Sequence, residues 1–456
     1  MLIRFIHCMK RIFYLLTIIA LFAACADDDT FSTSSSLRLS FSSDTISLDT
    51  LFSRTPSSTY AFWVHNRNDK GIRLSSVRLN RRNQTGYRVN VDGSYLDNGL
   101  GSQVNDLEIR SKDSILVFVE LTSPETSQEA PQLIEDDLVF TLESGLEQKV
   151  CLRAWSWDAV KMYDLLVTKD SVIESSTPII IYGGLTVGEG ATLTVRNTTL
   201  YFHNKAGIDV YGTLLTDSCV MRGDRLDRMF SYLPYDRVSG QWKGVHFHES
   251  SGQNVLSQTE IRNAEQAVVL DSAALDTTQV RLMMTGCIVH NAKGTGVESV
   301  NSRIKLVDCQ LTNTLGDCLL IVGGVADISG CTMAQFYPFS ADRGAALRFT
   351  NYRGETDIPL LRLTCKGSIL TGYDDDVLMG GVRDTVARFD YQFHNTLIRT
   401  PKVETADSIR FTAVRWESPK DSIQGKKHFK TIDEDNLYYD FHLDSLSTAQ
   451  GLGCYR

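Results

Sequence analysis

One stretch of the chain gathers side chains suited to holding a polar ligand. Between Arg222 and Arg237 it contains four arginines, three aspartates, two tyrosines and one phenylalanine. Aromatic rings offer flat apolar faces for stacking, and arginine and aspartate make paired hydrogen bonds. This composition predicts a ligand-binding insert, and the alternative is a loop held shut by its own Arg–Asp pairs. The residues predicted to contact a ligand are Arg225, Tyr232, Tyr235, Asp236, Arg237 and Trp242.

Candidates for acid–base chemistry are present but lack a decisive spacing. They are Lys243, His246, His248, Asp374 and Asp376. A polysaccharide lyase needs a base beside a group that neutralises a carboxylate, and the acidic loop could bind Ca²⁺. Exposed histidines on a strand are more often plain surface than ligands, and an acidic loop is usually only solvated. We therefore predict no catalytic residue, no metal ion and no cofactor.

A repeating pattern indicates the elements that must position these side chains. Cys287, Cys309 and Cys331 are evenly spaced, and asparagines recur four residues after this column. A residue type that recurs once per short repeat, with alternating inward positions around it, is typical of a β-solenoid. We expect the cysteines to stack in the interior. The asparagines should sit at a tight turn and bond to neighbouring coils; they are Asn263, Asn291 and Asn313.

Residues 37–160 are predicted to form a separate β-sandwich. Short runs rich in valine, isoleucine, tyrosine and phenylalanine alternate with turn signals such as Val91-Asp92-Gly93. Strands at this spacing are typical of a Greek-key sandwich. The predicted strands are Leu37–Phe41, Tyr60–His65, Ile72–Leu79, Tyr87–Val91, Ser114–Leu121, Asp137–Leu142 and Gln148–Trp155. Their order resembles the Ig-like modules that precede other domains in Bacteroidota surface proteins.

Three stretches after Lys161 carry a family pattern: Leu185–Val195, Gly207–Leu214 and Gln241–Phe247. They resemble the coils of right-handed parallel β-helix proteins, the pectate-lyase-like solenoids. The resemblance implies an all-β fold class, with an N-terminal Ig-like β-sandwich followed by a right-handed parallel β-helix. It assigns residues 161–400 to the β-helix and residues 401–456 to a C-terminal cap. This scaffold carries lyases, hydrolases and adhesins, so it implies no particular activity.

The N-terminus has the composition of a targeting segment. Lys10-Arg11 precedes an apolar run that ends at Ala24-Cys25. This resembles a bacterial lipoprotein signal over residues 1–24, in which Cys25 becomes the lipidated first residue. The cluster Asp27-Asp28-Asp29 resembles the signal that sends Bacteroidota lipoproteins to the outer face of the outer membrane. Residues 25–36 are expected to be a flexible tether.

Charge and composition narrow the choice of partners. The formal net charge is −9, which argues against a general nucleic-acid binder because such proteins need clustered cations. We predict a cell-surface lipoprotein that acts as a non-catalytic binding or structural module. Its partners would be the membrane, through the lipid anchor, and a glycan or a surface protein. The alternative is a polysaccharide lyase or glycoside hydrolase on the β-helix scaffold.

Overall fold

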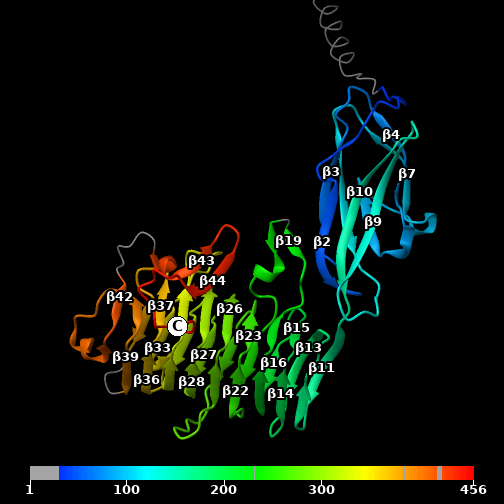
Figure 1. Ribbon diagram of the computed structural model, residues 1–456. Helices are drawn as coiled ribbons and strands as arrows, with labels where there is room; N and C mark the ends of the chain where they lie inside the picture. The colour runs from blue at the N-terminus through cyan, green and yellow to red at the C-terminus, as the bar shows by residue number, and fades with distance from the viewer. Residues whose placement is uncertain (1–29, 231, 384–386, 418–423) are drawn as a thin grey trace, which may run out of the picture. The chain divides into compact units, whose positions relative to one another are not determined.

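The computed structural model describes residues 30–230, 232–383, 387–417 and 424–456 (Figure 1). They form two compact units, which divide between Trp157 and Asp158. The predicted signal segment, Cys25 and the acidic cluster after it lie outside the described residues. Strands dominate both units, and helical structure in the described part is limited to five short 3-10 turns, so the predicted all-β fold class is confirmed. No described helix is both long and apolar enough to cross a membrane.

The N-terminal unit is a sandwich of two five-stranded sheets. One sheet has the order β1 (Ser40–Phe41), β3 (Tyr60–His65), β8 (Ser114–Leu121), β5 (Tyr87–Val91) and β6 (Ser94–Tyr95). The other has the order β2 (Thr45–Phe52), β10 (Glu147–Trp157), β9 (Gln132–Leu142), β4 (Ile72–Leu79) and β7 (Gln103–Ile109). The 3-10 turns η1 (Arg82–Gln84) and η2 (Asn98–Leu100) interrupt the connections. All pairings are antiparallel except the parallel pair of β2 and β10.

Alternation of side chains builds the sandwich core. Along β8, Val117, Val119 and Leu121 are buried, while Phe118 between them is exposed. A strand points successive side chains to opposite faces, so this alternation places one apolar row against the facing sheet. The predicted strands occur at their places, the first of them shortened to β1. The sequence-based prediction missed β2 and β7, in which polar residues break the apolar run.

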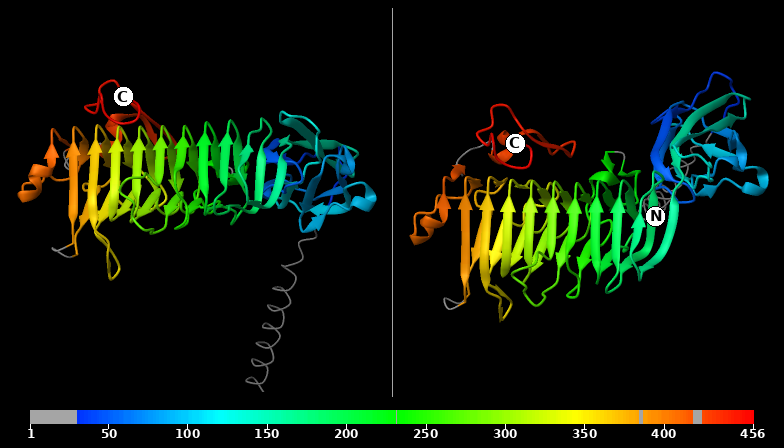
Figure 2. Two further views of the ribbon diagram at one scale, coloured as in Figure 1. Left: turned by 90° about the horizontal axis from the view of Figure 1, so that it is seen from below. Right: turned by 60° about the horizontal axis from the view of Figure 1, so that its bottom comes forward.

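The C-terminal unit is a parallel β-helix with three faces (Figure 2). Face 1 is a sheet of ten parallel strands, each from one coil. Its strands are β12 (Ser171–Ile173), β14 (Thr192–Arg196), β17 (Thr213–Asp217), β22 (Asn254–Ser257), β25 (Leu282–Thr285), β28 (Arg303–Val307), β31 (Gly324–Ser329), β36 (Leu360–Lys366), β39 (Phe389–His394) and β41 (Phe411–Thr412).

An 18-stranded sheet supplies the other two faces, because its strands pair in two parallel series. Strands β11 (Val160–Val167) and β13 (Ile179–Val187) begin both series. Face 2 continues with β15 (Thr199–Phe202), β18 (Val220–Gly223), β23 (Glu260–Arg262), β26 (Ile288–Ala292), β29 (Gln310–Thr314), β32 (Thr332–Gln335), β37 (Ile369–Gly372), β40 (Leu397–Arg399) and β42 (Arg415–Glu417). Face 3 continues with β16 (Ile208–Val210), β21 (Val245–Phe247), β24 (Val268–Leu270), β27 (Val297–Val300), β30 (Leu319–Val322), β33 (Leu347–Thr350) and β38 (Leu378–Gly381).

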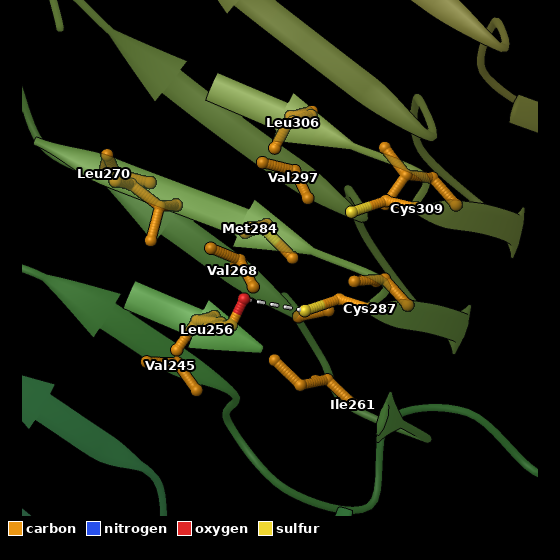
Figure 3. Packing of buried hydrophobic residues seen from close by; sticks show 14 of the residues in the cluster. Val245, Leu256, Ile261, Val268, Leu270, Met284, Cys287, Val297, Leu306 and Cys309 are labelled. Atoms are coloured by element: carbon orange, nitrogen blue, oxygen red, sulfur yellow. Dashed lines mark hydrogen bonds between the residues drawn. The ribbon is translucent and has the colours of Figure 1, made fainter. Parts of the chain in front are cut away.

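The cysteine column lies in the interior of the β-helix. Figure 3 shows Cys287 and Cys309 on neighbouring coils, among valine, leucine and methionine side chains. Cys331 stacks on the next coil, and all three are buried. The eight cysteines of the described residues are all free thiols. Burial raises the pKa of Cys219 to about 11 and that of Cys365 to about 12, so these thiols are core residues and not reactive thiolates.

The asparagine column lies at the turn between faces 2 and 3. Asn263, Asn291 and Asn313 all have φ between 55° and 63°, a left-handed conformation that asparagine tolerates better than most residues. The side-chain oxygen of Asn313 accepts a hydrogen bond from the backbone nitrogen of Phe336. The amide of Asn263 instead donates to the carbonyls of Asp236 and Val238 in the insert, at 2.9 and 3.1 Å. One position of the column therefore anchors the insert, a role that the repeat pattern did not predict.

Residues 401–456, expected to form one terminal cap, divide into two parts. The turn η4 (Ala406–Arg410) and strands β41 and β42 add a further coil to the β-helix. The turn η5 (Gln424–His428) and the antiparallel strands β43 (Phe429–Asp433) and β44 (Tyr438–Leu443) pack against face 2 (Figure 1). The outward side chains of face 2 are apolar at this point, including Ile369 and Leu397, so they need a cover along the flank of the β-helix and not only at its end.

Candidate functional site

Two structures rise from face 2 (Figure 1). The first is the insert, in which β19 (Arg228–Phe230) and β20 (Leu233–Pro234) pair and the turn η3 (Tyr235–Arg237) follows. The second is the C-terminal segment that contains β43 and β44. Cavities open between these two structures, and long connections on one flank of a solenoid are where binding surfaces commonly form.

The floor of the groove is built from neighbouring coils. Arg262 on β23, His290 on β26 and Thr312 on β29 are register partners. Parallel register places them in a row along the outside of face 2. The nitrogen Nδ1 of His290 lies 2.9 Å from the Thr312 hydroxyl, and the rings of Tyr439 and Phe441 lie about 6 Å from the imidazole. The regular coil spacing thus fixes a polar floor beneath a partly aromatic wall.

The first cavity, which we call the lateral groove, has a volume of about 560 Å³. Its floor and walls come from the insert, three neighbouring coils, the connection after β32 and the C-terminal segment. They are Asp236, Arg237, Glu260, Arg262, Ile288, His290, Asn291, Gln310, Asn313, Pro338, Leu437, Tyr438, Tyr439, Asp440, Phe441, His442 and Tyr455. Two buried polar atoms in this lining, Nδ2 of Asn313 and the hydroxyl of Tyr439, have no hydrogen-bond partner within the described chain. Such groups favour a polar ligand, because an unpaired buried polar group is costly.

Arginines pair with two of the three carboxylates that line the lateral groove, and the third, Asp440, lies 2.6 Å from His442. Asp236 lies 2.7 Å from Arg222 and 3.4 Å from Arg262, and Glu260 lies 3.3 Å from Arg262. Burial, and to a lesser degree the Arg262 charge, lowers the pKa of His290 to about 4. His290 is therefore neutral at neutral pH, and the groove floor offers hydrogen-bonding groups without an unpaired charge.

The second cavity, which we call the aromatic pocket, has a volume of about 940 Å³ and shares Pro338 and Leu437 with the lateral groove. Its lining is Tyr232, Leu233, Tyr337, Pro338, Phe339, Ala341, Arg343, Tyr373, Asp374, Lys426, Glu434, Asp435 and Leu437. The side chain of Tyr232 is 78% exposed and stacks on Phe230 with ring centroids 5.6 Å apart. Arg343 and Lys426 lie over the ring of Tyr373 at 4.6 and 5.1 Å. The pocket therefore combines exposed rings with fixed cations.

The structure places the predicted insert residues in three different surroundings. Asp236 and Arg237 line the lateral groove, and Tyr232 lines the aromatic pocket. Arg225 pairs with buried Asp227 at 2.6 Å and lies 4.3 Å from the centroid of the Tyr235 ring. These internal contacts stabilise the insert, as the alternative of a self-held loop proposed. Part of the insert is therefore a loop held by its own contacts, and the rest lines the two cavities.

Trp242, predicted to contact a ligand, lies in the core instead. It is 1% exposed and stacks on Phe202 with ring centroids 4.3 Å apart. Its indole nitrogen donates to the carbonyl oxygen of Arg262 at 2.9 Å. A large apolar ring beside a strand with inward-facing valine and phenylalanine is best placed in the interior, so its indole cannot reach a ligand.

The acidic loop Asp374–Asp376 supports the fold and does not form an open cation site. Asp375 pairs with the buried guanidinium of Arg399 at 2.8 Å, and the carbonyl oxygen of Asp374 accepts a hydrogen bond from the same side chain. Asp376 accepts a hydrogen bond from the Thr400 hydroxyl at 2.6 Å. The two histidines considered for catalysis, His246 and His248, lie elsewhere, on face 3.

A second group has the residue types of a hydrolytic triad. Nδ1 of His428 lies 3.2 Å from the Ser447 hydroxyl, and its Nε2 lies 3.4 Å from a carboxylate oxygen of Glu417. All three residues are buried, and the Ser447 oxygen accepts a hydrogen bond from the backbone nitrogen of Ala449. A substrate cannot reach this serine, so the group fastens the C-terminal segment to the β-helix.

Most of the lining was not predicted from the sequence. Residues 338–343 lie in the connection between β32 and β33, and residues 437–442 reach the groove because the C-terminal segment returns along face 2. The hydroxyl of Tyr455, for example, donates to Gln310, 145 positions earlier in the sequence, at 2.8 Å. The one available signal was local: aromatic residues cluster in both segments, beyond the regular coil pattern.

Comparisons with known proteins agree with this architecture. Residues 165–333 match the family model described as "Right handed beta helix region", which confirms the predicted hand of the β-helix. No curated protein matches the chain.

Among solved structures, the chain is similar to a family 123 glycoside hydrolase from Clostridium perfringens, with 9% identity over 28% of this chain and a TM-score of 0.19, and it spans 30% of that protein's length. It is similar to a PapD-like domain of human CEP192, with 13% identity, 29% and 94% coverage and a TM-score of 0.18. It is also similar to the catalytic domain of a GH87 α-1,3-glucanase, with 12% identity, 78% and 86% coverage and a TM-score of 0.34. No activity or substrate follows from likenesses of this size.

Proposed function

We propose that this protein is a non-catalytic binding protein of the cell surface, and that its ligand is a carbohydrate chain. The observation that carries the proposal is the pair of adjoining cavities between the insert and the C-terminal segment. Their volumes of about 560 and 940 Å³ are in the range of small-molecule sites. Because the cavities share lining residues, one elongated ligand can occupy both.

The lining chemistry suits sugars better than a protein or an apolar molecule. Tyr232 and Phe339 present exposed ring faces, against which the apolar face of a sugar can stack. Asn313, Tyr439 and Arg343 carry buried polar atoms without hydrogen-bond partners in the described chain. Hydroxyl groups both donate and accept, so a carbohydrate can satisfy amide, phenol and guanidinium groups together.

The electrostatics of the lateral groove favour binding over catalysis. Cleavage of a glycosidic bond by a hydrolase uses two carboxyl groups with separated roles. In the groove, Asp236 and Glu260 are both ion-paired with arginines, Asp440 lies 2.6 Å from His442, and the low pKa of His290 removes it as an acid at neutral pH. The alternative function is that of a polysaccharide lyase or hydrolase, which would release new chain ends from its substrate.

Replacing Tyr232 by alanine should weaken carbohydrate retention about two- to tenfold, the value of one aromatic contact of about 0.5–1.5 kcal/mol. The purified protein would be incubated with a panel of plant and host polysaccharides, and bound material and newly released chain ends would be measured together. Tyr439→Phe, which removes only an unpaired hydroxyl in the groove, should also weaken retention without lowering thermal stability.

Tyr95→Ala is the matched control, because Tyr95 is 52% exposed but belongs to the N-terminal unit. Retention that is equal in wild type, Tyr232→Ala and Tyr439→Phe would refute the proposed groove site. Retention by no polysaccharide would move the proposal to a surface protein as partner. Released ends would establish the catalytic alternative.

The cell-surface part of the proposal depends on Cys25. Its position after a basic and apolar segment and before three aspartates supports lipidation and display on the outer face of the outer membrane. Cells fed a labelled fatty acid should incorporate the label into wild-type protein, and Cys25→Ala should abolish it. Cys8→Ala, in the same segment, should leave the label unchanged. A label that persists in Cys25→Ala would exclude this anchor.

A further inference from the structure

Face 3 carries a cluster of two histidines and two aspartates that the proposed binding function does not use. Asp209 on β16 and His246 on β21 are register partners on adjacent coils. His248 follows β21, and Asp271 follows β24 on the next coil. Parallel register brings residues of three coils to one patch, although they are scattered over more than 60 positions of sequence.

Three of the four side chains, Asp209, His246 and His248, each bring a donor atom near one point. Nε2 of His248 lies 2.9 Å from Oδ1 of Asp209, and Nδ1 of His246 lies 3.9 Å from the same oxygen. One donor atom from each of these three residues lies within 4.8 Å of the other two. In a tetrahedral zinc site, bonds of about 2.0–2.1 Å place neighbouring donor atoms about 3.3 Å apart. The Asp209–His248 distance of 2.9 Å is shorter than this value, and the Asp209–His246 distance of 3.9 Å is longer.

We propose that Asp209, His246 and His248 bind a divalent transition-metal ion of the Zn²⁺ type. Imidazole nitrogen with one carboxylate oxygen is a ligand set suited to Zn²⁺ and its neighbours, whereas Ca²⁺ and Mg²⁺ prefer oxygen ligands alone. Three protein ligands leave one position of a tetrahedral ion for water or a ligand atom. The inference departs from the sequence-based expectation of no metal, which had no means of seeing Asp209 beside the histidines.

Asp271 supports the assignment of a metal site, because it contacts the imidazole nitrogens of His246 and His248 that face away from Asp209. Its Oδ1 lies 2.8 Å from Nε2 of His246, and its Oδ2 lies 3.4 Å from Nδ1 of His248. In each imidazole, the nitrogen that does not face Asp209 therefore faces Asp271. A carboxylate behind a metal-bound histidine fixes the ring and its tautomer, and this arrangement recurs in zinc proteins.

The surrounding contacts hold the cluster rigid. The ring of Tyr211 stacks on His248 with centroids 4.1 Å apart and an interplanar angle of 2°. Arg281 donates hydrogen bonds to the carbonyl oxygens of His248 and Asp271, which fixes the two strand ends. The ligand side chains are between 20% and 43% exposed, so an ion can enter from solvent without any rearrangement of the fold.

Titration of metal-free purified protein with Zn²⁺, followed by calorimetry, tests the site. We expect saturable binding of one ion per chain. His248→Ala and Asp209→Ala should weaken it by at least about tenfold, and Asp271→Asn by about 10–100-fold, as for other supporting carboxylates. A second readout is the visible absorption of the Co²⁺-loaded protein, which should show tetrahedral bands that the His248→Ala protein lacks.

His203→Ala is the matched control, because His203 is a partly exposed histidine 2.7 Å from Asp224 that has no second histidine in its cluster. Its affinity for Zn²⁺ should equal that of wild type. Circular dichroism would show that each variant is folded, which the outward position of these side chains favours. No saturable binding by wild type, or equal affinity in all the variants, would overturn the proposal.

Discussion

Replacing Glu417 by alanine is expected to lower the free energy of unfolding of the β-helix unit by about 3 kcal/mol, because breaking a buried ion pair leaves an uncompensated charge. The guanidinium of Arg399 is fully buried and lies 3.2 Å from the equally buried Glu417 carboxylate on the adjacent coil. Removal of Glu417 also leaves the Thr371 hydroxyl, which donates to it at 2.7 Å, without an acceptor. The loss is at the lower end of the usual range because Asp375 still pairs with Arg399.

Chemical denaturation followed by circular dichroism measures this effect, with Glu355→Ala as the control. Glu355 also pairs with an arginine, Arg383, but is 94% exposed, so its removal should cost between 0 and about 1 kcal/mol. Equal losses in Glu417→Ala and Glu355→Ala would show that the buried group does not hold the C-terminal coils together.

The Glu417 carboxyl also makes the stability of the fold depend on pH, and its contribution is lost as the pH falls. Burial raises the pKa of the Glu417 carboxyl, but the His428 ring, the Thr371 hydroxyl and the Arg399 charge outweigh it and hold the pKa below the ordinary 4.5. A carboxyl with a lowered folded-state pKa stabilises the fold above its unfolded pKa and loses that contribution as pH falls. The stability difference between wild type and Glu417→Gln should therefore be full at neutral pH and shrink below pH 4.5.

The fold was largely predictable because each coil of the β-helix has the same packing requirements as the next. The columns of Cys287 and Asn291 recur once per coil, and each coil must bury the same inward positions and turn at the same place. A periodic sequence therefore reveals a periodic backbone without any long-range information. The strands β2 and β7 escaped prediction because polar residues interrupt their alternation, and pairing with neighbouring strands overrides the local preference.

The candidate sites were less predictable because they depend on register between distant segments. Asp209 and His246 are adjacent in the structure, but the insert lengthens the coil between them, so their spacing is longer than the 22-residue repeat of the cysteine column. In the lateral groove, Tyr455 reaches Gln310 only because the C-terminal segment folds back along the flank. Sequence patterns report the residues of each segment, but the side of the β-helix to which a non-repeating segment returns is decided by the apolar patch that it covers.

Replacing Trp242 by alanine distinguishes the ligand contact predicted from the sequence from the core position that the structure gives this residue. If the indole contacted a ligand, Trp242→Ala would lower binding and leave stability unchanged. Because the ring is buried against Phe202, we expect the free energy of unfolding to fall by about 3–5 kcal/mol, the usual cost of truncating a core aromatic residue. The lost hydrogen bond to the Arg262 carbonyl would also disturb the floor of the lateral groove, so carbohydrate retention should weaken as a consequence of the altered fold.

Thermal unfolding and polysaccharide retention, measured on the same samples, separate these effects. Trp155→Ala is the control, because Trp155 is 43% exposed on the sandwich and should change neither quantity much. Trp242→Phe keeps an aromatic ring in the core but loses the indole donor and part of the buried volume, so it should recover part of the stability. A Trp242→Ala protein with wild-type thermal stability and reduced retention would place the indole at the ligand after all, and would require the coil that carries β21 to open outward from the core.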